Sequence, residues 1–267
     1  MSCFPWPVST ALCVARYAGF DGVEIFRFRA FWQYTNLKHY RAIASTQDLL
    51  INFHETWSFG YTDTTHAILR VPALWGALLP ENARLEEQFA GAKENELVVA
   101  FPHHLDEIIA AKRPNWAVQT NALWRYDHYD VPFERFIQKV IEHHLPVVFD
   151  TQHYLEYENG KVGVENLSLN SERHMSSLKR AFDKLRPQIR EIHLNNFMPP
   201  KGHDLGRNLP LHEGILNLPE FCQYVKASGW TGTVVPELHP RFFSRYSISK
   251  NIDIAKELND DVRSLFA

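Results

Sequence analysis

The stretch FERFIQKVIEHHLPVVFD, residues 133–150, contains one complete unit of the fold. Its apolar residues first recur at helical spacing, from Phe133 to Ile141, which predicts a helix with one buried face. Pro146 cannot continue that helix, and the short apolar run 147–150 that follows is typical of a buried parallel strand. The stretch therefore predicts a helix, a strand immediately after it, and a carboxylate at the end of the strand.

The same unit recurs along the whole chain. Strands are predicted at residues 22–26, 49–57, 97–101, 116–123, 147–150, 189–194 and 233–238. Apolar stripes at helical spacing lie between most of them, and a last helix is predicted at 247–266. Such alternation predicts an α/β protein with a parallel sheet covered by helices. The number of units fits a (β/α)8 TIM barrel that forms a single domain over residues 1–267, with a doubly wound open sheet as the alternative.

The first strand of this barrel is the weakest part of the pattern. Only residues 2–6 precede the first predicted helix, so this strand is expected to be short or incomplete. Two connections, residues 155–173 and 197–214, are longer than a packing turn requires. Both follow predicted strands, which places them at the C-terminal face of the barrel, where active sites of such barrels lie.

The composition argues against several classes of protein. The 7 Trp, 10 Tyr and 18 Phe provide apolar area for a large core, which argues against disorder. The 28 Lys and Arg against 31 Asp and Glu lack the basic surplus of a nucleic-acid binder. The 3 Cys are scattered and predict neither a disulfide framework nor a thiolate zinc site. Without a membrane-length apolar stretch or a secretory signal pattern, we expect a cytoplasmic protein with no membrane partner.

Polar side chains stand at or near the ends of nearly all predicted strands. They are Glu24, His54, Asn121, Asp150 with His153 soon after it, His193 and Glu237. Asp150, His193 and Glu237 are separated by one strand–helix unit each, and strand ends of a closed barrel converge at its mouth. Two carboxylates and one imidazole suit a hard or borderline divalent metal ion such as Mn, Zn, Mg, Co or Fe.

Five segments carry a resemblance to a known family. They are GFDGVEIF (19–26), VVFDTQHY (147–154), IREIHLNNF (189–197), GRNLPLHEGILNLPEF (206–221) and GWTGTVVPEL (229–238). Together they resemble the xylose-isomerase-like TIM barrel superfamily, which includes sugar (phosphate) isomerases and epimerases and the metal-dependent apurinic endonucleases. The resemblance covers essentially the whole chain in order, although each motif is short.

This resemblance implies roles for individual residues. Asp150, His193 and Glu237 would hold one divalent metal ion, and Glu237 would also be the general base. His153 would contact a substrate oxygen or a second metal ion and take part in catalysis. Glu24 and His54 would line the mouth of the barrel.

Three further residues are candidates for substrate binding. Arg207 lies in the long loop after the seventh strand and could grip a phosphate or a sugar hydroxyl. Trp57, just past His54, could stack on a sugar ring. Asn121 lies near the end of the strand predicted at 116–123 and could line the mouth.

The strand predicted at 116–123 is the fifth of the barrel when residues 2–6 are counted as the first, and it departs from the family pattern. The family usually has a second glutamate there, and this chain has residues 119–121, Gln-Thr-Asn. In the epimerases that the chain resembles, two metal-bound glutamates flank the substrate, and one removes a proton next to a carbonyl while the other returns it. Three possibilities follow here. Glu237 acts alone, a neighbour such as Glu55, Asp204 or His153 substitutes, or catalysis is lost.

We therefore expect a divalent-metal-dependent isomerase or epimerase that acts on a sugar, a sugar phosphate or a related polyhydroxy carbonyl compound. A metal-dependent phosphodiesterase similar to the apurinic endonucleases is one alternative. It needs more metal ligands, and Phe101 and the net charge of −3 argue against it. A non-catalytic barrel that binds a metabolite or a protein partner is the other. The sequence does not predict the oligomeric state.

The same residues also have structural interpretations. Asp150 or Glu237 could cap the helix that follows its strand, and His193 could be a core histidine. The adjacent pairs His103–His104 and His143–His144 resemble metal ligands only superficially, because neighbouring side chains point in different directions. We expect these pairs to be solvated or to lie at helix ends.

Overall fold

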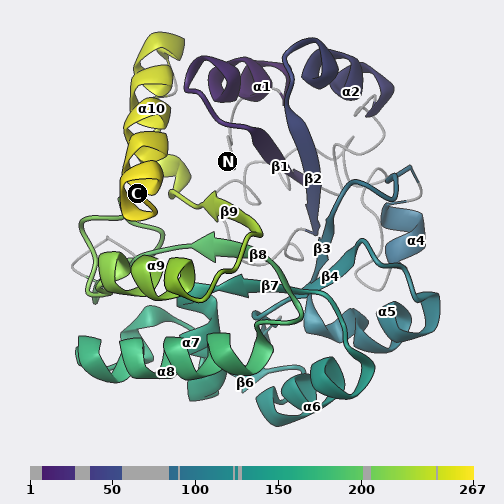
Figure 1. Cartoon of the computed structure of the whole chain (residues 1–267), viewed down its shortest axis with the longest axis vertical. Helices are drawn as coiled ribbons and strands as arrows, with labels where there is room; N and C mark the ends of the chain where they lie inside the picture. The colour runs from purple at the N-terminus through teal and green to yellow at the C-terminus, as the bar shows by residue number, and fades with distance from the viewer. Residues whose placement is uncertain are drawn as a thin grey trace.

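The computed structural model describes residues 8–27, 37–55, 84–89, 91–122, 124–125, 128–200, 206–244 and 246–267. Seven parallel strands form one sheet in these residues and curl into a nearly closed barrel (Figure 1). In sheet order they are β1 (Gly22–Arg27), β2 (Leu50–Glu55), β3 (Val98–Ala100), β4 (Trp116–Gln119), β7 (Val147–Asp150), β8 (Ile189–Leu194) and β9 (Thr233–Pro236).

The order of the strands distinguishes between the two predicted architectures. A doubly wound sheet reverses its strand order at a switch point, whereas here the order in the sheet follows the chain from β1 to β9. The α/β TIM-barrel prediction is therefore confirmed. The strand predicted at residues 2–6 lies outside the described residues, and β1 and β9 are the edge strands of the described sheet.

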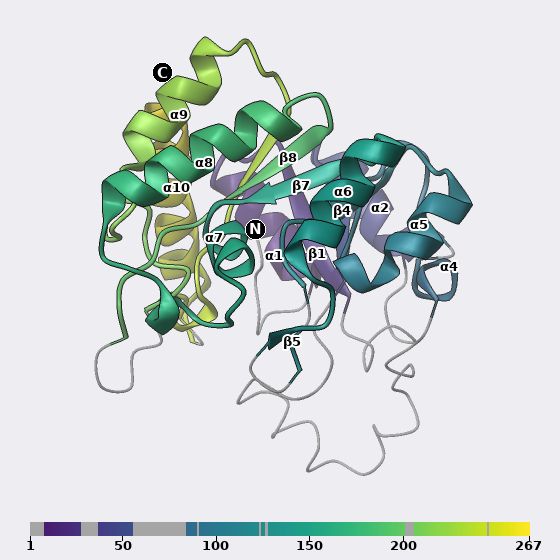
Figure 2. The ribbon, with the colours of Figure 1, turned by 90° about the horizontal axis from the view of Figure 1, so that it is seen from below.

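Helices surround the strands (Figures 1 and 2). They are α1 (Val8–Tyr17), α2 (Leu37–Thr46), α4 (Leu85–Gln88), α5 (Leu105–Ala111), α6 (Phe133–His143), α7 (Thr151–Asn159), α8 (Ser171–Leu185), α9 (Leu218–Ala227) and α10 (Ile248–Leu265). Short additional elements are the 3-10 turns η3 (Pro102–His104), η4 (Val164–Asn166) and η5 (Pro240–Phe242) and the antiparallel pair β5 (Trp124–Arg125) and β6 (His128–Tyr129).

The first and last helices meet beside the edge strands. Helix α10 packs against α1 (Figure 1). Asn259 Nδ2 of α10 donates a hydrogen bond to the Ala18 carbonyl, just past α1, at 3.1 Å. The N-terminal and C-terminal parts of the barrel are thus joined through their helices.

Helix α6 forms as its apolar stripe predicts. Phe136, Ile137 and Val140 are buried against the sheet. The helix ends at His143, and His144 takes the left-handed conformation of a C-cap with a φ of 51°. This pair therefore lies at a helix end, as predicted.

The segment predicted as a long loop from residue 155 is different. Helix α7 starts directly after β7 and continues to Asn159. The Asp150 side chain caps it, because Oδ1 accepts hydrogen bonds from the backbone N–H groups of Gln152 at 3.0 Å and His153 at 2.7 Å. The prediction that residues 155–159 belong to a loop was wrong, because a strand-end carboxylate starts a helix there.

The strands alternate between two environments. One face of the sheet packs against the helices in the main core, to which Phe53, Val98 and Phe149 belong. Val99, Ala117 and Val148 instead form a separate buried cluster. Because successive side chains of a strand point to opposite faces, this second cluster lies inside the barrel.

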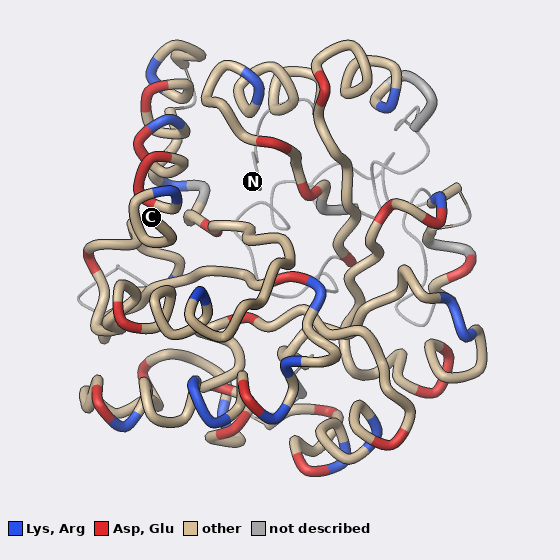
Figure 3. Tube along the Cα trace, in the orientation of Figure 1, with Lys and Arg blue, Asp and Glu red and all other residues tan. Residues whose placement is uncertain are grey.

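Charged residues of both signs are spread over the outer helices (Figure 3). Acidic residues also occur on the strands themselves, as on β1 and β8. No helix of the described part of the chain is long and apolar enough to cross a membrane.

Candidate metal centre and active site

Inside the barrel, the side chains beyond Val99, Ala117 and Val148 towards the carboxyl ends of the strands are polar. Gln119 and Asp150 each stand two residues beyond a member of the apolar layer, so they point to the same interior. On β8, Glu191 and His193 are likewise two residues apart and share a face. The strand geometry therefore directs amide, carboxylate and imidazole groups into one buried space.

The three predicted metal ligands come together there. His193 Nδ1 lies 3.1 Å from Glu237 Oε1 and 3.8 Å from Asp150 Oδ2. One donor atom from each of the three residues lies within 4.8 Å of the other two. Asp150 and His193 are fully buried, and the side chain of Glu237 is 12% exposed. The convergence expected from their spacing is thus present in the fold.

A second pair of carboxylates faces the other nitrogen of the same ring. His193 Nε2 lies 3.2 Å from Glu24 Oε2 and 3.1 Å from Glu191 Oε1. Burial by itself lowers the pKa of His193, but Glu24 and Glu237 raise it well above its usual value. Burial and the Glu24 charge raise the pKa of Glu191 to about 7. The site is therefore rich in negative charge around one imidazole.

Two asparagines hold the carboxylates in place. Asn195 Nδ2 donates hydrogen bonds to Asp150 Oδ2 at 2.9 Å and to Glu237 Oε2 at 3.2 Å. Asn208 Nδ2 donates to the same Glu237 oxygen at 3.0 Å. Burial raises the pKa of Asp150, while His193 outweighs burial and lowers the pKa of Glu237 to about 2. Glu237 Oε1 remains next to the imidazole.

The sequence departs from the family pattern at residues 119–121, and of these Gln119 is the one that faces the central group. Its Nε2 lies 3.1 Å from His193 Nδ1 and donates to Asp150 Oδ2 at 3.2 Å. Its Oε1 lies 3.1 Å from His54 Nε2. Thr120 does not face this group, since its Oγ1 accepts the backbone N–H of Asp150 at 2.9 Å. A neutral amide therefore stands among the carboxylates.

His153 belongs to a neighbouring group at the start of α7. Its Nδ1 lies 3.2 Å from Glu156 Oε2. Burial lowers the pKa of His153, but Asp150 and Glu156 together raise it to about 9. Arg207 lies close enough to Glu156 to lower the pKa of that carboxyl. His153 is therefore a cation at neutral pH, with Arg207 near its partner.

The other predicted site residues are distributed as follows. His54 and Glu24 are buried in the central group, and the His54 ring stacks on that of His193 at a centroid distance of 5.6 Å. Asn121 is buried, and its Oδ1 has no hydrogen-bond partner among the described residues, as is also true of Arg207 Nε. Trp57 lies outside the described residues.

Several side chains that contact the predicted site residues were not themselves predicted. They are Glu191, Asn195, Asn208 and Glu156. Glu191 could have been identified, because its spacing of two from His193 puts both on one face of a strand. Asn208 lies in a loop, and the sequence carries no periodic signal for where its side chain meets Glu237.

His103 and His104 lie at a helix end, as predicted, since His104 is the N-cap residue of α5. The expectation that their side chains point in different directions was wrong. His104 is only 6% exposed, and the two rings lie 4.0 Å apart between centroids. Both approach Glu55 at the end of β2, His104 Nε2 at 2.9 Å. The turn η3 brings the rings together because it is not an extended strand, in which neighbouring side chains point to opposite faces.

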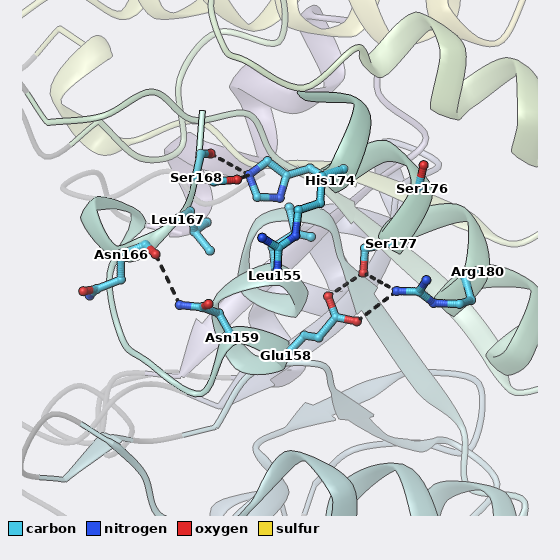
Figure 4. A pocket seen from close by; sticks show the side chains of 11 residues that line it. Leu155, Glu158, Asn159, Asn166, Leu167, Ser168, His174, Ser176, Ser177 and Arg180 are labelled. Carbon is cyan, nitrogen blue, oxygen red and sulfur yellow. Dashed lines mark hydrogen bonds and ion pairs between the residues drawn. The ribbon is translucent and has the colours of Figure 1, made fainter. Parts of the chain in front are cut away.

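A surface pocket of about 530 Å³ lies away from these groups, between α7, η4 and α8 (Figure 4). Glu158 contacts Ser177 and Arg180 along one side of it. His174 Nε2 lies 2.7 Å from the Ser168 carbonyl on the other side. The pocket is lined by helix-surface residues, whereas the strand-end groups lie inside the barrel.

Comparison with known proteins agrees with this fold. The family model of the xylose isomerase-like TIM barrel matches residues 123–262, more than half of the chain. No curated protein matches the sequence.

Three similar solved structures extend over nearly the whole chain. The IolI protein with a bound zinc atom is 17% identical, with a TM-score of 0.58 over 97% of each chain. A xylose isomerase domain protein from Alicyclobacillus acidocaldarius is 13% identical, with a TM-score of 0.54 over 98% of this chain and 94% of that chain. The D-psicose 3-epimerase of Clostridium cellulolyticum H10, solved with D-tagatose, is 12% identical, with a TM-score of 0.52 over 99% and 95%. At these identities the likeness shows the fold alone.

Proposed function

Because the chain belongs to the xylose isomerase-like TIM barrel family, we propose that it is a divalent-metal-dependent isomerase or epimerase of a sugar, a sugar phosphate or a related polyhydroxy carbonyl compound. The observation that carries the proposal is the convergence of Asp150 Oδ2, His193 Nδ1 and Glu237 Oε1 from three adjacent strands. The similar solved structures that are sugar epimerases or hold zinc support it.

The donor atoms fit a metal ion. Two carboxylate oxygens and one imidazole nitrogen are ligands that Mn²⁺, Zn²⁺, Mg²⁺, Co²⁺ and Fe²⁺ accept. Burial of several carboxylates around one ring is costly without a cation. The two asparagines that hold Asp150 and Glu237 would act as outer partners that fix the orientation of the ligands.

Glu237 is the proposed general base. A bound metal ion would polarise the substrate carbonyl and so make the neighbouring C–H group more acidic. A carboxylate that binds a cation is ionised, so Glu237 would be able to accept a proton from the substrate at neutral pH. Asn195 and Asn208 hold Oε2 and leave Oε1 on the side of His193.

His153 is the proposed second group for proton transfer and substrate contact. Glu156 holds its Nδ1, and an imidazole beside a carboxylate can donate and accept a proton near neutral pH. Because residues 119–121 at the end of β4 contain no glutamate, the His153 imidazole near Glu237 is the substitute we favour. Asn121 and Arg207 would bind substrate oxygens through their otherwise unpartnered atoms.

Solvent exchange tests this proposal directly. Metal-loaded protein would be incubated in D2O with ketoses, aldoses and their phosphates, and deuterium at the carbon next to the carbonyl would be measured by NMR. We expect exchange in the wild type and a loss of about 100-fold or more in Glu237→Gln, the range of general acid–base catalysis. His153→Gln should lower exchange while the metal content stays unchanged, which separates its role from that of a ligand.

Two outcomes would contradict the proposal. Metal-loaded wild type that exchanges no proton in any of these substrates would favour the non-catalytic barrel, and a sugar that raises its melting temperature would then identify a binding protein. Nicking of abasic-site duplex DNA would instead favour the phosphodiesterase.

A further inference from the structure

A second group of metal-ligating side chains lies outside the centre described above. Glu55 ends β2, and His103 and His104 belong to η3 after the next strand. Glu55 Oε1 lies 2.9 Å from His104 Nε2 and 3.6 Å from His103 Nε2. One donor atom from each of the three residues lies within 4.8 Å of the other two. Two imidazoles and a carboxylate thus face one point.

Their surroundings orient these atoms. The Phe101 backbone N–H donates to Glu55 Oε2 at 3.0 Å, which leaves Oε1 facing the two histidines. His104 Nδ1 lies 3.1 Å from Glu107 Oε2, so this carboxylate can fix the ring with Nε2 directed at Glu55. A carboxylate behind a histidine nitrogen is the arrangement that commonly orients a metal-ligating histidine.

We propose that Glu55, His103 and His104 bind a second divalent cation of the zinc type. Bonds of about 2.0 to 2.2 Å to nitrogen and oxygen put tetrahedral ligand atoms roughly 3.4 Å apart. The two distances from Glu55 Oε1 lie on either side of that value, and the donor atoms of the two rings lie within 4.8 Å of each other, so binding would draw the rings towards one point. Two histidines and one glutamate leave a fourth position for water or a ligand, as in catalytic zinc sites.

This site is separate from the barrel centre. The two groups share no residue, and the Phe101 ring packs against His54 of the centre as well as against His103. Their donor chemistry also differs. The centre has two carboxylates and one imidazole, whereas this site has one carboxylate and two imidazoles and should favour Zn²⁺ or Co²⁺ over Mn²⁺ and Mg²⁺.

The ions can reach the site from solvent. The His103 side chain is 18% exposed, whereas those of Glu55 and His104 are 1% and 7% exposed. Without a metal ion, the group would be an ion pair in which protonated His104 bridges Glu55 and Glu107. The two arrangements make different predictions. Only the metal site binds Zn²⁺, and only there does removal of the His103 ring reduce Zn²⁺ binding.

Zinc counting tests the proposal. Full-length protein would be stripped with a chelator and titrated with Zn²⁺ in competition with a chromophoric chelator at neutral pH. His103→Ala is the main variant because this ring is partly exposed, and Glu55→Gln is the second. His128→Ala removes an exposed histidine elsewhere and is the matched control. Circular dichroism would show whether each variant is folded.

We expect His103→Ala to bind one equivalent of Zn²⁺ less than the wild type and His128→Ala to bind the same number. Glu237→Gln should keep the equivalent that His103→Ala removes. In that variant, Co²⁺ should give an absorption band that disappears when His103→Ala is added. Equal zinc stoichiometry and affinity in His103→Ala and wild type would overturn the proposal. Glu237→Gln reports on the barrel centre and His103→Ala on the second site. A negative result for one of the two proposals therefore leaves the other standing.

Discussion

At the scale of single residues, Gln119 places a neutral amide among the candidate metal ligands. Its amide nitrogen lies within 3.2 Å of Asp150 Oδ2 and 3.1 Å of His193 Nδ1, so a third carboxylate there would face the same point. We expect Gln119→Glu to raise the affinity for Mn²⁺ by about tenfold or more, which corresponds to about 1.4 kcal/mol. Calorimetric titration would measure the change.

The same substitution should weaken the metal-free protein. A further buried carboxylate beside Asp150 adds repulsion that only a cation relieves. Gln119→Leu, which removes the amide without adding charge, is the control and should gain no affinity. Unchanged Mn²⁺ affinity in Gln119→Glu would show that position 119 does not face the metal.

Glu55 should give the metal-free protein a defined pH dependence. Burial raises its pKa, but hydrogen bonding and the charges of His104 and His103 lower it to about 2, below the ordinary value of 4.5. A lowered carboxyl pKa stabilises the fold fully above the unfolded value of 4.5, and this contribution is lost as the pH falls through the folded value of about 2. The difference corresponds to about 3 kcal/mol at most.

Urea unfolding in the presence of a chelator would test this pH dependence. The difference in unfolding free energy between wild type and Glu55→Gln should shrink as the pH is lowered from 5 towards 3. Glu158→Gln, at the edge of the surface pocket, serves as the comparison. A difference that stays constant over this range would contradict the lowered pKa of Glu55.

The sequence predicted those site residues that end a strand. Asp150, His193 and Glu237 could be identified because the strand ends of a barrel converge, whatever the details of packing. The residues that orient them depend on tertiary contacts. Asn208 contacts Glu237 from a loop. His104 follows β3 and contacts Glu55 at the end of the neighbouring strand β2, so neither contact can be predicted from periodicity.

At the scale of elements, Asp150 joins a strand to a helix as well as facing the centre. Its Oδ1 caps α7, and its Oδ2 accepts from Asn195 and Gln119. Asn is as good an N-cap as Asp, whereas Ala lacks the cap and costs about 0.5 to 2 kcal/mol. We therefore expect Asp150→Ala to unfold at lower urea concentration than Asp150→Asn, and both variants to lose metal binding. Equal stability of the two variants would mean that the cap contributes nothing.

An element could be predicted from the sequence only where a periodic pattern of apolar and polar residues marks it or its neighbours. Strand β8 was predicted at its observed bounds because it lies between two helices with clear apolar stripes, α8 and α9. Helix α7 was missed because all residues from Thr151 to Tyr157 are buried, so no polar face marks its period. The pair β5 and β6 contains only two residues in each strand, too few for any period to appear.

At the scale of the whole molecule, the barrel interior has an apolar lower layer and, towards the carboxyl ends of the strands, a charged upper layer. Val99, Ala117 and Val148 fill the lower layer without any polar atom in their side chains. The upper layer buries Glu24, Glu191 and other carboxylates around His193. Because β1, β2, β4, β7 and β8 and the residue after β9 contribute polar side chains to this layer, the binding of a cation there should stabilise most of the sheet and not one loop.

Thermal unfolding tests this coupling between the centre and the fold. Mn²⁺ at about 100 times its Kd should add about 2.7 kcal/mol, which in a chain of this size corresponds to a rise in Tm of roughly 5 to 10 °C. Mn²⁺ is the ion of choice because nitrogen-rich sites such as that of His103 bind it weakly. Glu237→Gln should lose most of the shift, whereas His103→Ala should retain it, since only the first residue belongs to the centre. A Tm that Mn²⁺ leaves unchanged would mean that the carboxylates of the barrel centre are stabilised by protonation and by hydrogen bonds alone.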